Sequence, residues 1–376
     1  MKKTLLTICL VWMCFSLSAQ KIIDLSGKWS FSIDRQDNGE KEKWFSHTLN
    51  DFINLPGSMP EKLKGDEVTA KTQWTGSLYD SSYYYNPYME KYRKEGNIKF
   101  PFFLTPDKHY VGAAWYQKEV NIPADWKGER ILLFLERPHI ETTVWVNGQK
   151  TGIQNSLCVP HQYDITRYVR PGKCTITIRV DNRIKEINVG PDSHSITDQT
   201  QGNWNGIVGR ICLQTTPKTY FDDIQIYPEP EQKLARVKVV IKGTGTAKVK
   251  LSAESFNTDK KHIVPAIQQE IKLNKGVTET EMVLPMGNDM LLWDEFHPAL
   301  YKLKAEVTNG KKTEIKEIQF GIRRFEIKGK WFYVNGRKTQ LRGTVENCDF
   351  PLTGYAPMDV ESWERVFRIC RSYGLN

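Results

Sequence analysis

The sequence predicts a mainly β protein: two antiparallel sandwiches, followed by the first strand and helix of a parallel α/β fold. Three observations support this. Short runs of alternating apolar and polar residues recur from residue 22 to about residue 320, turn residues separate the runs, and helical periodicity begins only near the C-terminal end. Of the 376 residues, 39% are hydrophobic and 26% are charged. That composition excludes a disordered chain, a collagen-like chain and a multi-span membrane protein.

The first nineteen residues resemble an export signal. Lys2 and Lys3 precede an apolar run over 5–17, and small residues follow at 16–19. The run is too short to span a bilayer, and no later stretch is long and apolar enough to do so. We therefore expect residues 1–19 to be a signal peptide cleaved after Ala19, and a periplasmic or secreted protein without a membrane span.

The strand-like runs place two β domains after the signal. The runs cover 29–33, 115–120, 131–134, 142–146, 175–180, 224–227, 237–241, 248–253 and 301–307, with a further strand closing at 210–214. Turn pairs such as Asn147-Gly148 and Asn309-Gly310 separate them, because Asn and Gly tolerate a positive φ. We assign 20–220 to the first sandwich and 221–321 to an immunoglobulin-like sandwich, which has that fold's length without its Cys-Trp-Cys pattern.

The pattern changes in the last segment, 322–376. A hairpin is predicted around Asn335-Gly336, and residues 342–346 are predicted to form a strand. Asp359 is a candidate N-cap and Gly374 a candidate C-cap of a helix with Glu361 in its first turn. Its apolar residues recur at helical spacing, at Val360, Trp363, Val366, Phe367 and Cys370. Strand, loop, helix and next strand form the opening unit of a β/α barrel.

Charge and cysteines restrict the chemistry. The net charge of +9 comes from Lys and Arg spread along the chain, which indicates a solvated surface and no nucleic-acid partner. Two of the seven cysteines lie in the signal, and the other five lack the spacing of a disulfide framework or a zinc site, so we expect buried thiols. No phosphate loop, nucleophile elbow or metalloprotease motif occurs. We expect no metal and no cofactor.

Six strings, in order, resemble glycoside hydrolase family 2, which contains β-galactosidases, β-glucuronidases and β-mannosidases. AAWYQKEVNIP (113–123), VWVNGQKTG (144–152), YDITRYVRPG (163–172) and NWNGIVGRICL (203–213) resemble its jelly-roll-like sugar-binding sandwich. LLWDEFHPALYKLKAEV (291–307) is similar to its immunoglobulin-like domain, and FGIRRFEIKGKWFYVNGRKTQLRG (320–343) to the start of its catalytic barrel.

The resemblance implies a retaining exo-β-glycosidase acting on oligo- or polysaccharide. Such enzymes use two carboxylic acids about 5 Å apart, one as acid and one as nucleophile. In the family both are glutamates on later barrel strands, whereas a barrel needs about 250 residues and only about 35 follow Arg342. We therefore expect the catalytic glutamates beyond Asn376, no catalytic residue within this sequence, and a (β/α)8 barrel that is truncated here.

Two groups are candidate substrate contacts. Glu346 and Asn347 lie at the C-terminal end of the first barrel strand, where such barrels bind substrate, and this role is favoured over an ion pair or a loop cap for Glu346. In RGTVENCD, Val345 and Asn347 stand where many family members carry Asn and His, so the sugar specificity is expected to diverge.

The second group is Asp198, Asn203 and Trp204. In the family a loop at this point reaches the pocket, and amides, a carboxylate and an indole suit a sugar. A turn held by its own hydrogen bonds, with Trp204 in the core, fits these residues equally well.

Other polar and aromatic residues are interpreted as structural. The tyrosines of the 74–103 insertion either stack on sugars or fasten the loop to the sandwich, and the second is slightly favoured. Trp115 and Trp145 are expected in the core, and His161 with Asp164 in an ordinary turn. The rival functions are a non-catalytic carbohydrate-binding or adhesion sandwich and an inactive truncated product. A homo-oligomer is left open.

Overall fold

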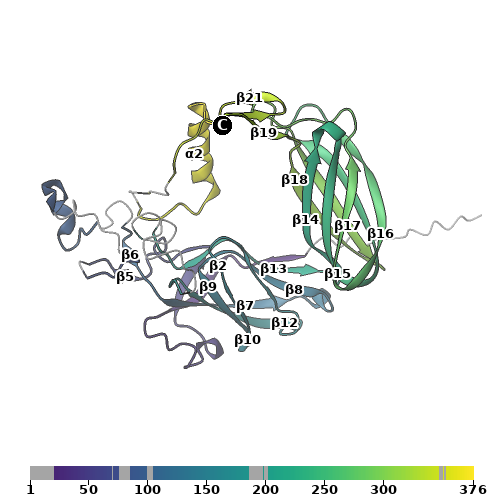
Figure 1. Ribbon diagram of the computed structural model, residues 1–376. Helices are drawn as coiled ribbons and strands as arrows, with labels where there is room; N and C mark the ends of the chain where they lie inside the picture. Colours follow the sequence, from purple (N-terminus) through teal and green to yellow (C-terminus); the bar gives the residue numbers. More distant parts are fainter. Residues whose placement is uncertain are drawn as a thin grey trace, which may run out of the picture. The chain divides into compact units, whose positions relative to one another are not determined.

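The structure is a computed structural model that describes residues 21–69, 71–75, 85–99, 105–185, 198, 202–346, 350 and 353–376 (Figure 1). Two compact units divide the chain. One comprises Ile22–Thr215 with Gln340–Asn376, and the other contains Thr216–Thr339. Within the described residues, no helix has both the length and the hydrophobicity needed to cross a bilayer.

The first unit contains a sandwich of two antiparallel sheets (Figure 1). The six-stranded sheet runs in the order β10 (Gln149–Asn155), β9 (Glu141–Val146), β12 (Gly172–Asp181), β7 (Ala113–Ile122), β2 (Gly27–Asp34) and β3 (Asp51–Leu55). The other runs in the order β1 (Ile22–Asp24), β13 (Gly206–Thr216), β8 (Arg130–His139) and β11 (His161–Asp164), with β4 (Gly57–Ser58) also paired to β13.

The core of this sandwich follows from the alternation along its strands. In β2, Trp29 and Phe31 are fully buried in one hydrophobic cluster, together with Tyr116 of β7, Leu133 of β8 and Ile178 of β12. Because successive strand residues point to opposite faces, every second residue enters the core. Each such large side chain contributes about 1.5–3 kcal/mol when it leaves water.

A second aromatic cluster contains Trp115 and Trp145. Both are buried, as expected from the sequence, but they form a separate cluster with Leu49. Trp44 and Phe45 pack against this cluster, and the Phe45 ring stacks on Trp145 at 5.1 Å between centroids. Trp44 belongs to the short helix η1 (Trp44–Ser46) in the connection between β2 and β3. The connection therefore has a small core of its own.

The second unit is built around two long, bent strands. The strands are β14 (Tyr220–Glu229), β15 (Leu234–Phe256), β16 (Ile263–Pro285), β17 (Leu300–Asn309) and β18 (Lys312–Phe320). The sequence predicts separate runs at 237–241 and 248–253, but both lie within β15, whose first half pairs with β14 and second half with β17. A bulge at Gly243/Gly245 joins the halves, and Gly245 has a φ of 86°, which a glycine adopts without strain.

Residues 325–339 confirm the predicted hairpin. A three-stranded sheet contains β19 (Phe325–Lys328), β20 (Trp331–Val334) and β21 (Arg337–Thr339). Val334 pairs with Arg337 across the turn, and Asn335 and Gly336 have φ values of 51° and 77°. Positive φ at both central residues is the geometry that Asn-Gly supports best.

The expected strand at 342–346 is not formed. Residues 340–346 form no strand among the described residues. A β-strand needs a neighbouring strand with which its backbone forms a ladder of hydrogen bonds. Two hydrogen bonds join residue 342 to the end of the chain. The N–H of Asn376 donates to the carbonyl of Arg342 at 3.0 Å, and the N–H of Arg342 donates to the Asn376 side chain at 2.8 Å. The chain after the helix therefore returns beside residue 342.

The predicted helix is confirmed as α2 (Val360–Ser372). The Asp359 carboxylate accepts from the N–H of Ser362 at 2.7 Å, which is an N-cap. At the other end Gly374, with a φ of 78°, donates to Arg371, and Leu375 donates to Cys370. Those two bonds form a Schellman motif.

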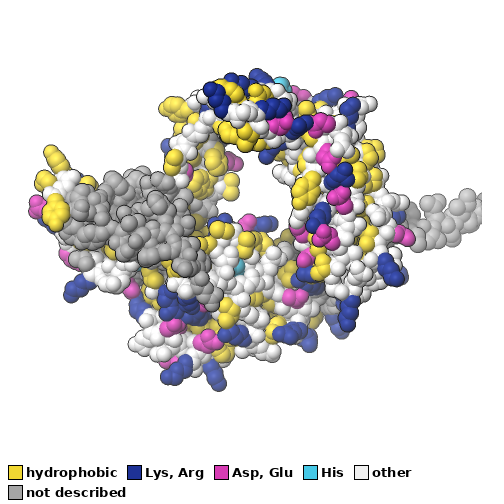
Figure 2. Space-filling view, viewed as in Figure 1, with side chains coloured by type: hydrophobic (Ala, Val, Ile, Leu, Met, Phe, Trp, Pro, Cys, Tyr) yellow, Lys and Arg dark blue, Asp and Glu magenta, His cyan; other side chains and the backbone are white. Residues whose placement is uncertain are grey.

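The apolar face of α2 remains largely exposed. Val360 is 74% exposed and Phe367 64%, and Figure 2 shows hydrophobic side chains along this helix. None of the residues of α2 is buried. The helix therefore gains little from packing, and an exposed apolar face of this kind promotes association.

Short elements complete the described chain. They are β5 (Asp66–Glu67), β6 (Lys108–His109), η2 (Pro87–Arg93), η3 (Ala124–Trp126) and η4 (Pro230–Gln232). In the insertion, Tyr85 and Tyr88 are 84% and 82% exposed, so the expectation that they fasten the loop to the sandwich is wrong for these two. Tyr79, Tyr83 and Tyr84 lie outside the described residues.

The cysteines divide by burial. Cys174 and Cys212 are buried as expected, and burial raises the pKa of the Cys174 thiol to about 11. Cys370 is half-buried, and Cys348 lies outside the described residues. Cys158 is exposed, so the expectation of a buried thiol is wrong there, because it follows β10 in a polar surface turn.

Candidate functional site

Asp198 lies buried, 3% exposed, where three segments of the first unit meet. Its Oδ2 accepts from the N–H of Thr75 at 2.5 Å, and its Oδ1 accepts from the N–H of Asn203 at 2.8 Å. His109 of β6 places Nε2 3.3 Å from the same Oδ1. The carboxylate therefore connects residue 75, β6 and the segment that leads into β13.

Asn203 continues this connection. Its side-chain amide donates to Thr75 Oγ1 at 2.9 Å and to the carbonyl of Asn182 at 3.0 Å. Among the residues that the structure describes, none provides a hydrogen bond to the buried Oδ1 atom. Two of its polar contacts are thus internal, and one buried acceptor remains unsatisfied.

Trp204 is half-buried and stacks on His139. The ring centroids are 4.5 Å apart and the planes lie within 19°. His139 Nδ1 lies 2.7 Å from the carbonyl oxygen of Trp204, so Nδ1 carries the proton and donates. Burial lowers the pKa of His139 to about 4, although this hydrogen bond acts in the opposite direction. The imidazole is therefore neutral near pH 7 and fixes the backbone at residue 204.

Asn205 belongs to the same segment, and sequence reasoning did not select it as a functional residue. It is 1% exposed, accepts from the Tyr116 hydroxyl at 2.7 Å, and donates to the carbonyls of Gly112 and Val180, each at 3.0 Å. His109 was also missed; its ring packs on Trp74 at 4.6 Å. The local sequence signal for Asn205 is weak: it is a polar residue directly before Gly206, where the buried strand β13 begins.

The residues predicted at the barrel end lie on the surface or outside the described chain. Glu346 is exposed, and Asn347 lies outside the described residues. Further along, Gly354, with a φ of 75°, lies against the backbone of Thr105 and Pro106, where a Cβ would have no room. A Cβ on Gly202 would lie 3.9 Å from the carbonyl oxygen of Gly354. The two predicted groups thus belong to neighbouring segments of one unit.

The arrangement is suited to holding a loop rather than to acid–base chemistry. Asp198 has both oxygens engaged by the protein, and His139 is buried and neutral near pH 7. The part of the chain that the structure describes contains no group of three His, Cys, Asp or Glu side chains able to hold a metal ion. The substrate-binding role of Asp198, Asn203, Trp204, Glu346 and Asn347 stays a prediction.

The expected turn is confirmed at Asp164, the last residue of β11, but is wrong for His161, which is a buried residue of the same strand. Asp164 accepts from the N–H of Thr166 at 3.1 Å and from Arg130 at 2.8 Å, which closes a turn after β11. His161 is fully buried, and its Nδ1 lies 2.6 Å from Thr142 Oγ1. Burial lowers the pKa of His161.

Two family models match the chain in succession. The model described as glycosyl hydrolases family 2, sugar binding domain, matches residues 22–217, and the model described as glycosyl hydrolases family 2 matches residues 219–323. The chain belongs to glycoside hydrolase family 2. Its mainly β, two-sandwich architecture is that of the family's N-terminal domains.

Curated relatives agree with this membership. A β-glucuronidase from Paenibacillus borealis is 24% identical over 355 residues, which is 89% of this chain and 51% of the relative. The human β-glucuronidase is 24% identical over 391 residues, covering 94% and 52%. A β-galactosidase from Thermoanaerobacter pseudethanolicus is 25% identical over 281 residues, covering 70% and 35%. The chain spans about half or less of the length of these relatives.

Solved structures share the fold. A β-glucuronidase from Ruminococcus gnavus, in complex with D-glucuronic acid, matches with a TM-score of 0.67 at 19% identity and covers 96% of this chain and 55% of that one. A second crystal structure of that enzyme gives the same TM-score at 20% identity. At this identity the likeness establishes the fold alone.

Proposed function

We propose that this chain is the N-terminal part of an exported, retaining exo-β-glycosidase that acts on oligo- or polysaccharide fragments. The observation that carries the proposal is the order of the two family domains, over residues 22–217 and 219–323. Relatives that align with 89% and 70% of this chain carry the names β-glucuronidase and β-galactosidase. Family membership supports the retaining mechanism, which uses two carboxylic acids and a covalent glycosyl intermediate.

We further propose that residues 322–376 form the start of the catalytic barrel. Asn376 bonds to Arg342, as the next parallel strand of a β/α unit would, and α2 connects the two. The two catalytic glutamates would then come from barrel strands outside this sequence. Glu346 and Asn347, at the end of the first barrel strand, would face the substrate.

The Asp198 region supports this function indirectly. Asp198 and Asn203 tie residue 75, β6 and Asn182 together, and Gly354 lies close to Gly202, the residue before Asn203. Their role in the proposed enzyme is to position the segment that carries Trp204. Trp204, half-buried beside a neutral His139, keeps an aromatic surface that suits a sugar ring.

We include export in the proposal because Lys2, Lys3 and the apolar run over 5–17 resemble a signal sequence. The mature protein would begin at Gln20. Mass spectrometry of the exported protein is expected to show loss of the first nineteen residues. An uncleaved N-terminus in an exporting host would contradict this part of the proposal.

Hydrolysis assays test the activity. The polypeptide encoded by the complete reading frame containing these 376 residues is offered nitrophenyl β-glucuronide, β-galactoside and β-mannoside, with the matching α-glycosides as controls. We expect turnover of at least one β-glycoside and of no α-glycoside, and no turnover by the 376-residue polypeptide itself. Failure on all β-glycosides, or turnover by the 376 residues alone, would contradict the proposal.

A further inference from the structure

One edge of β16 has no neighbouring strand among the described residues. β16 pairs with β15 along its length, and the described chain contains no strand on its other side. In Figure 1, β16 is the outermost strand on one side of the second unit. The backbone N–H and C=O groups along that free edge therefore lack strand partners, and such an edge is a template for pairing with another chain.

Two other sheet edges are closed by side-chain hydrogen bonds. In the second unit, β14 and β18 end the strand order, and β18 is fastened to Phe221 of β14. The N–H of Phe221 donates to Glu314 at 2.6 Å, and its carbonyl accepts from Lys316 at 2.5 Å. In the first unit, the side-chain amide of Gln154 covers the edge strand β11, because it accepts from the N–H of Gln162 at 3.2 Å and donates to the carbonyl of that residue. Side chains thus take the place of a missing strand at both edges.

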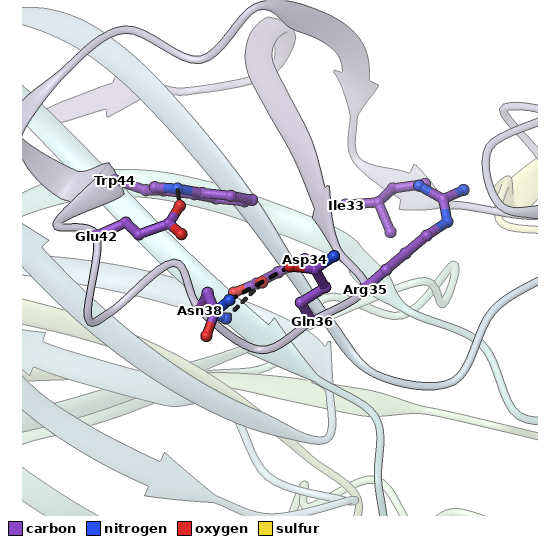
Figure 3. A pocket seen from close by; sticks show the side chains of 7 residues that line it. All are labelled: Ile33, Asp34, Arg35, Gln36, Asn38, Glu42 and Trp44. Carbon is purple, nitrogen blue, oxygen red and sulfur yellow. Dashed lines mark hydrogen bonds between the residues drawn. The ribbon is translucent and has the colours of Figure 1, made fainter.

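The polar groups at the end of β2 also find partners within the protein. A cavity of about 220 Å³ opens there, and Figure 3 shows the side chains that line it. Asp34 accepts from the N–H of Asn38 at 2.9 Å, and the indole of Trp44 donates to Glu42 at 2.9 Å. The connection after β2 therefore satisfies its own polar groups, unlike the free edge of β16.

The central part of the β16 edge is regular. Residues 267–273 pair with residues 245–251 of β15 without interruption, and the register shifts on either side of this segment. In the part of the chain that the structure describes, no side chain bonds to the backbone of residues 267–273. Pro265, which has no N–H to donate, lies outside the segment. Residues 267–273 are therefore the part of the edge along which a partner strand can form a ladder.

The charges on this segment are self-complementary. Glu270 and Lys272 are both exposed and lie on the same face, two residues apart. When two copies pair antiparallel about a two-fold axis at Ile271, Glu270 of each copy lies opposite Lys272 of the other. An axis at residue 270 or 272 would instead place like charges opposite each other. Opposite charges across an antiparallel pair stabilise it and like charges destabilise it, so the axis at Ile271 is the favoured one.

We propose that the free edge of β16 is the docking surface for a second copy of this chain, paired antiparallel about Ile271. The backbone ladder provides the affinity, and the two Glu270–Lys272 pairs fix the register. The Ile271 side chains, each 7% exposed, meet across the axis on the apolar face of the sheet. The surface lies in the second unit and does not depend on the proposed hydrolase activity.

Sedimentation velocity at a series of protein concentrations tests the pairing. The 376-residue protein carries Phe367→Lys throughout, so that the exposed face of α2 does not contribute to association. We expect a reversible equilibrium between monomer and dimer. Hydrogen exchange of peptides covering 267–273 should slow as the protein concentration rises, because pairing protects the N–H groups of the free edge. A monomer at every concentration, or exchange that does not depend on concentration, would overturn the proposal.

Charge reversal tests the register. Glu270→Lys and Lys272→Glu each convert both opposite-charge pairs into like-charge pairs, so each is expected to raise the Kd of the dimer at least about tenfold. The double variant restores opposite charges and should return the Kd to within about threefold of the parent value. Lys311→Glu, which makes the same change of net charge in the exposed turn between β17 and β18, is the matched control and should leave the Kd unchanged. Single reversals without effect, or a double variant that dimerises no better than the single ones, would overturn the proposal.

Discussion

Replacing Asp198 by alanine should destabilise the first unit and free the segment before β13. The change removes the acceptor of two backbone N–H groups, those of Thr75 and Asn203, and the partner of His109. An unsatisfied buried donor costs about 1–3 kcal/mol, and Thr75 is only partly buried, so we expect a total loss of about 2–4 kcal/mol. Asp198→Asn keeps one acceptor oxygen but turns an NH2 donor toward the other backbone N–H, so we expect a loss close to that of the alanine variant.

The assay has two readouts. Urea unfolding followed by tryptophan fluorescence reports the free energy of unfolding, and hydrogen exchange by mass spectrometry reports protection of peptides covering 71–75 and 202–205. Asp107→Ala, an exposed aspartate just before β6, is the matched control and should change the free energy by less than about 0.5 kcal/mol. An Asp198→Ala variant as stable and as protected as the control would refute the structural role. If that variant also lost sugar turnover in the complete enzyme, direct substrate contact would be indicated.

Three further outcomes are expected. Asn205→Ala should cost about 2–4 kcal/mol of unfolding free energy, because Tyr116 and two buried carbonyls lose their partner. Denaturant titration measures the free energy of unfolding, and a loss below about 1 kcal/mol would contradict the prediction. His139 has a folded pKa of about 4, below its unfolded pKa of about 6.5, so the unfolded chain binds an extra proton between these values. The free energy of unfolding should therefore fall as the pH drops from 6.5 to 4, by up to about 1.4 kcal/mol per pH unit. His139→Gln, which still donates to Trp204, should flatten this dependence of stability on pH, and an unchanged slope would contradict the assignment to His139. Phe367→Lys should reduce self-association measured by light scattering, because it interrupts the exposed face of α2; equal particle size in both proteins would show that this face is not responsible.

Local patterns predicted most of the fold. The alternation of β2 and β7, the Asn335-Gly336 turn and the caps at Asp359 and Gly374 depend on neighbours within a few residues, so the sequence shows them directly. The sequence does not predict β16, because most of its 23 residues are exposed and Glu and Lys, of which it has several, are depleted in strands.

The candidate site was harder to predict because its contacts are distant in sequence. Asp198 bonds to Thr75 across 123 positions and to His109 across 89, and no local pattern encodes such pairs. The polar string before β13 marked Asp198 and Asn203 as important without distinguishing substrate contact from loop anchoring. Their burial and internal hydrogen bonds favour anchoring.

Covalent trapping tests the proposed retaining mechanism most directly. The polypeptide from the complete reading frame is incubated with fluorinated β-glycosides of the sugars that it hydrolyses, and its intact mass is measured. A retaining enzyme accumulates the glycosyl intermediate, so the account predicts a mass increase of one fluorinated sugar per chain. Hydrolysis that proceeds with no adduct and with inversion at the anomeric carbon would contradict it.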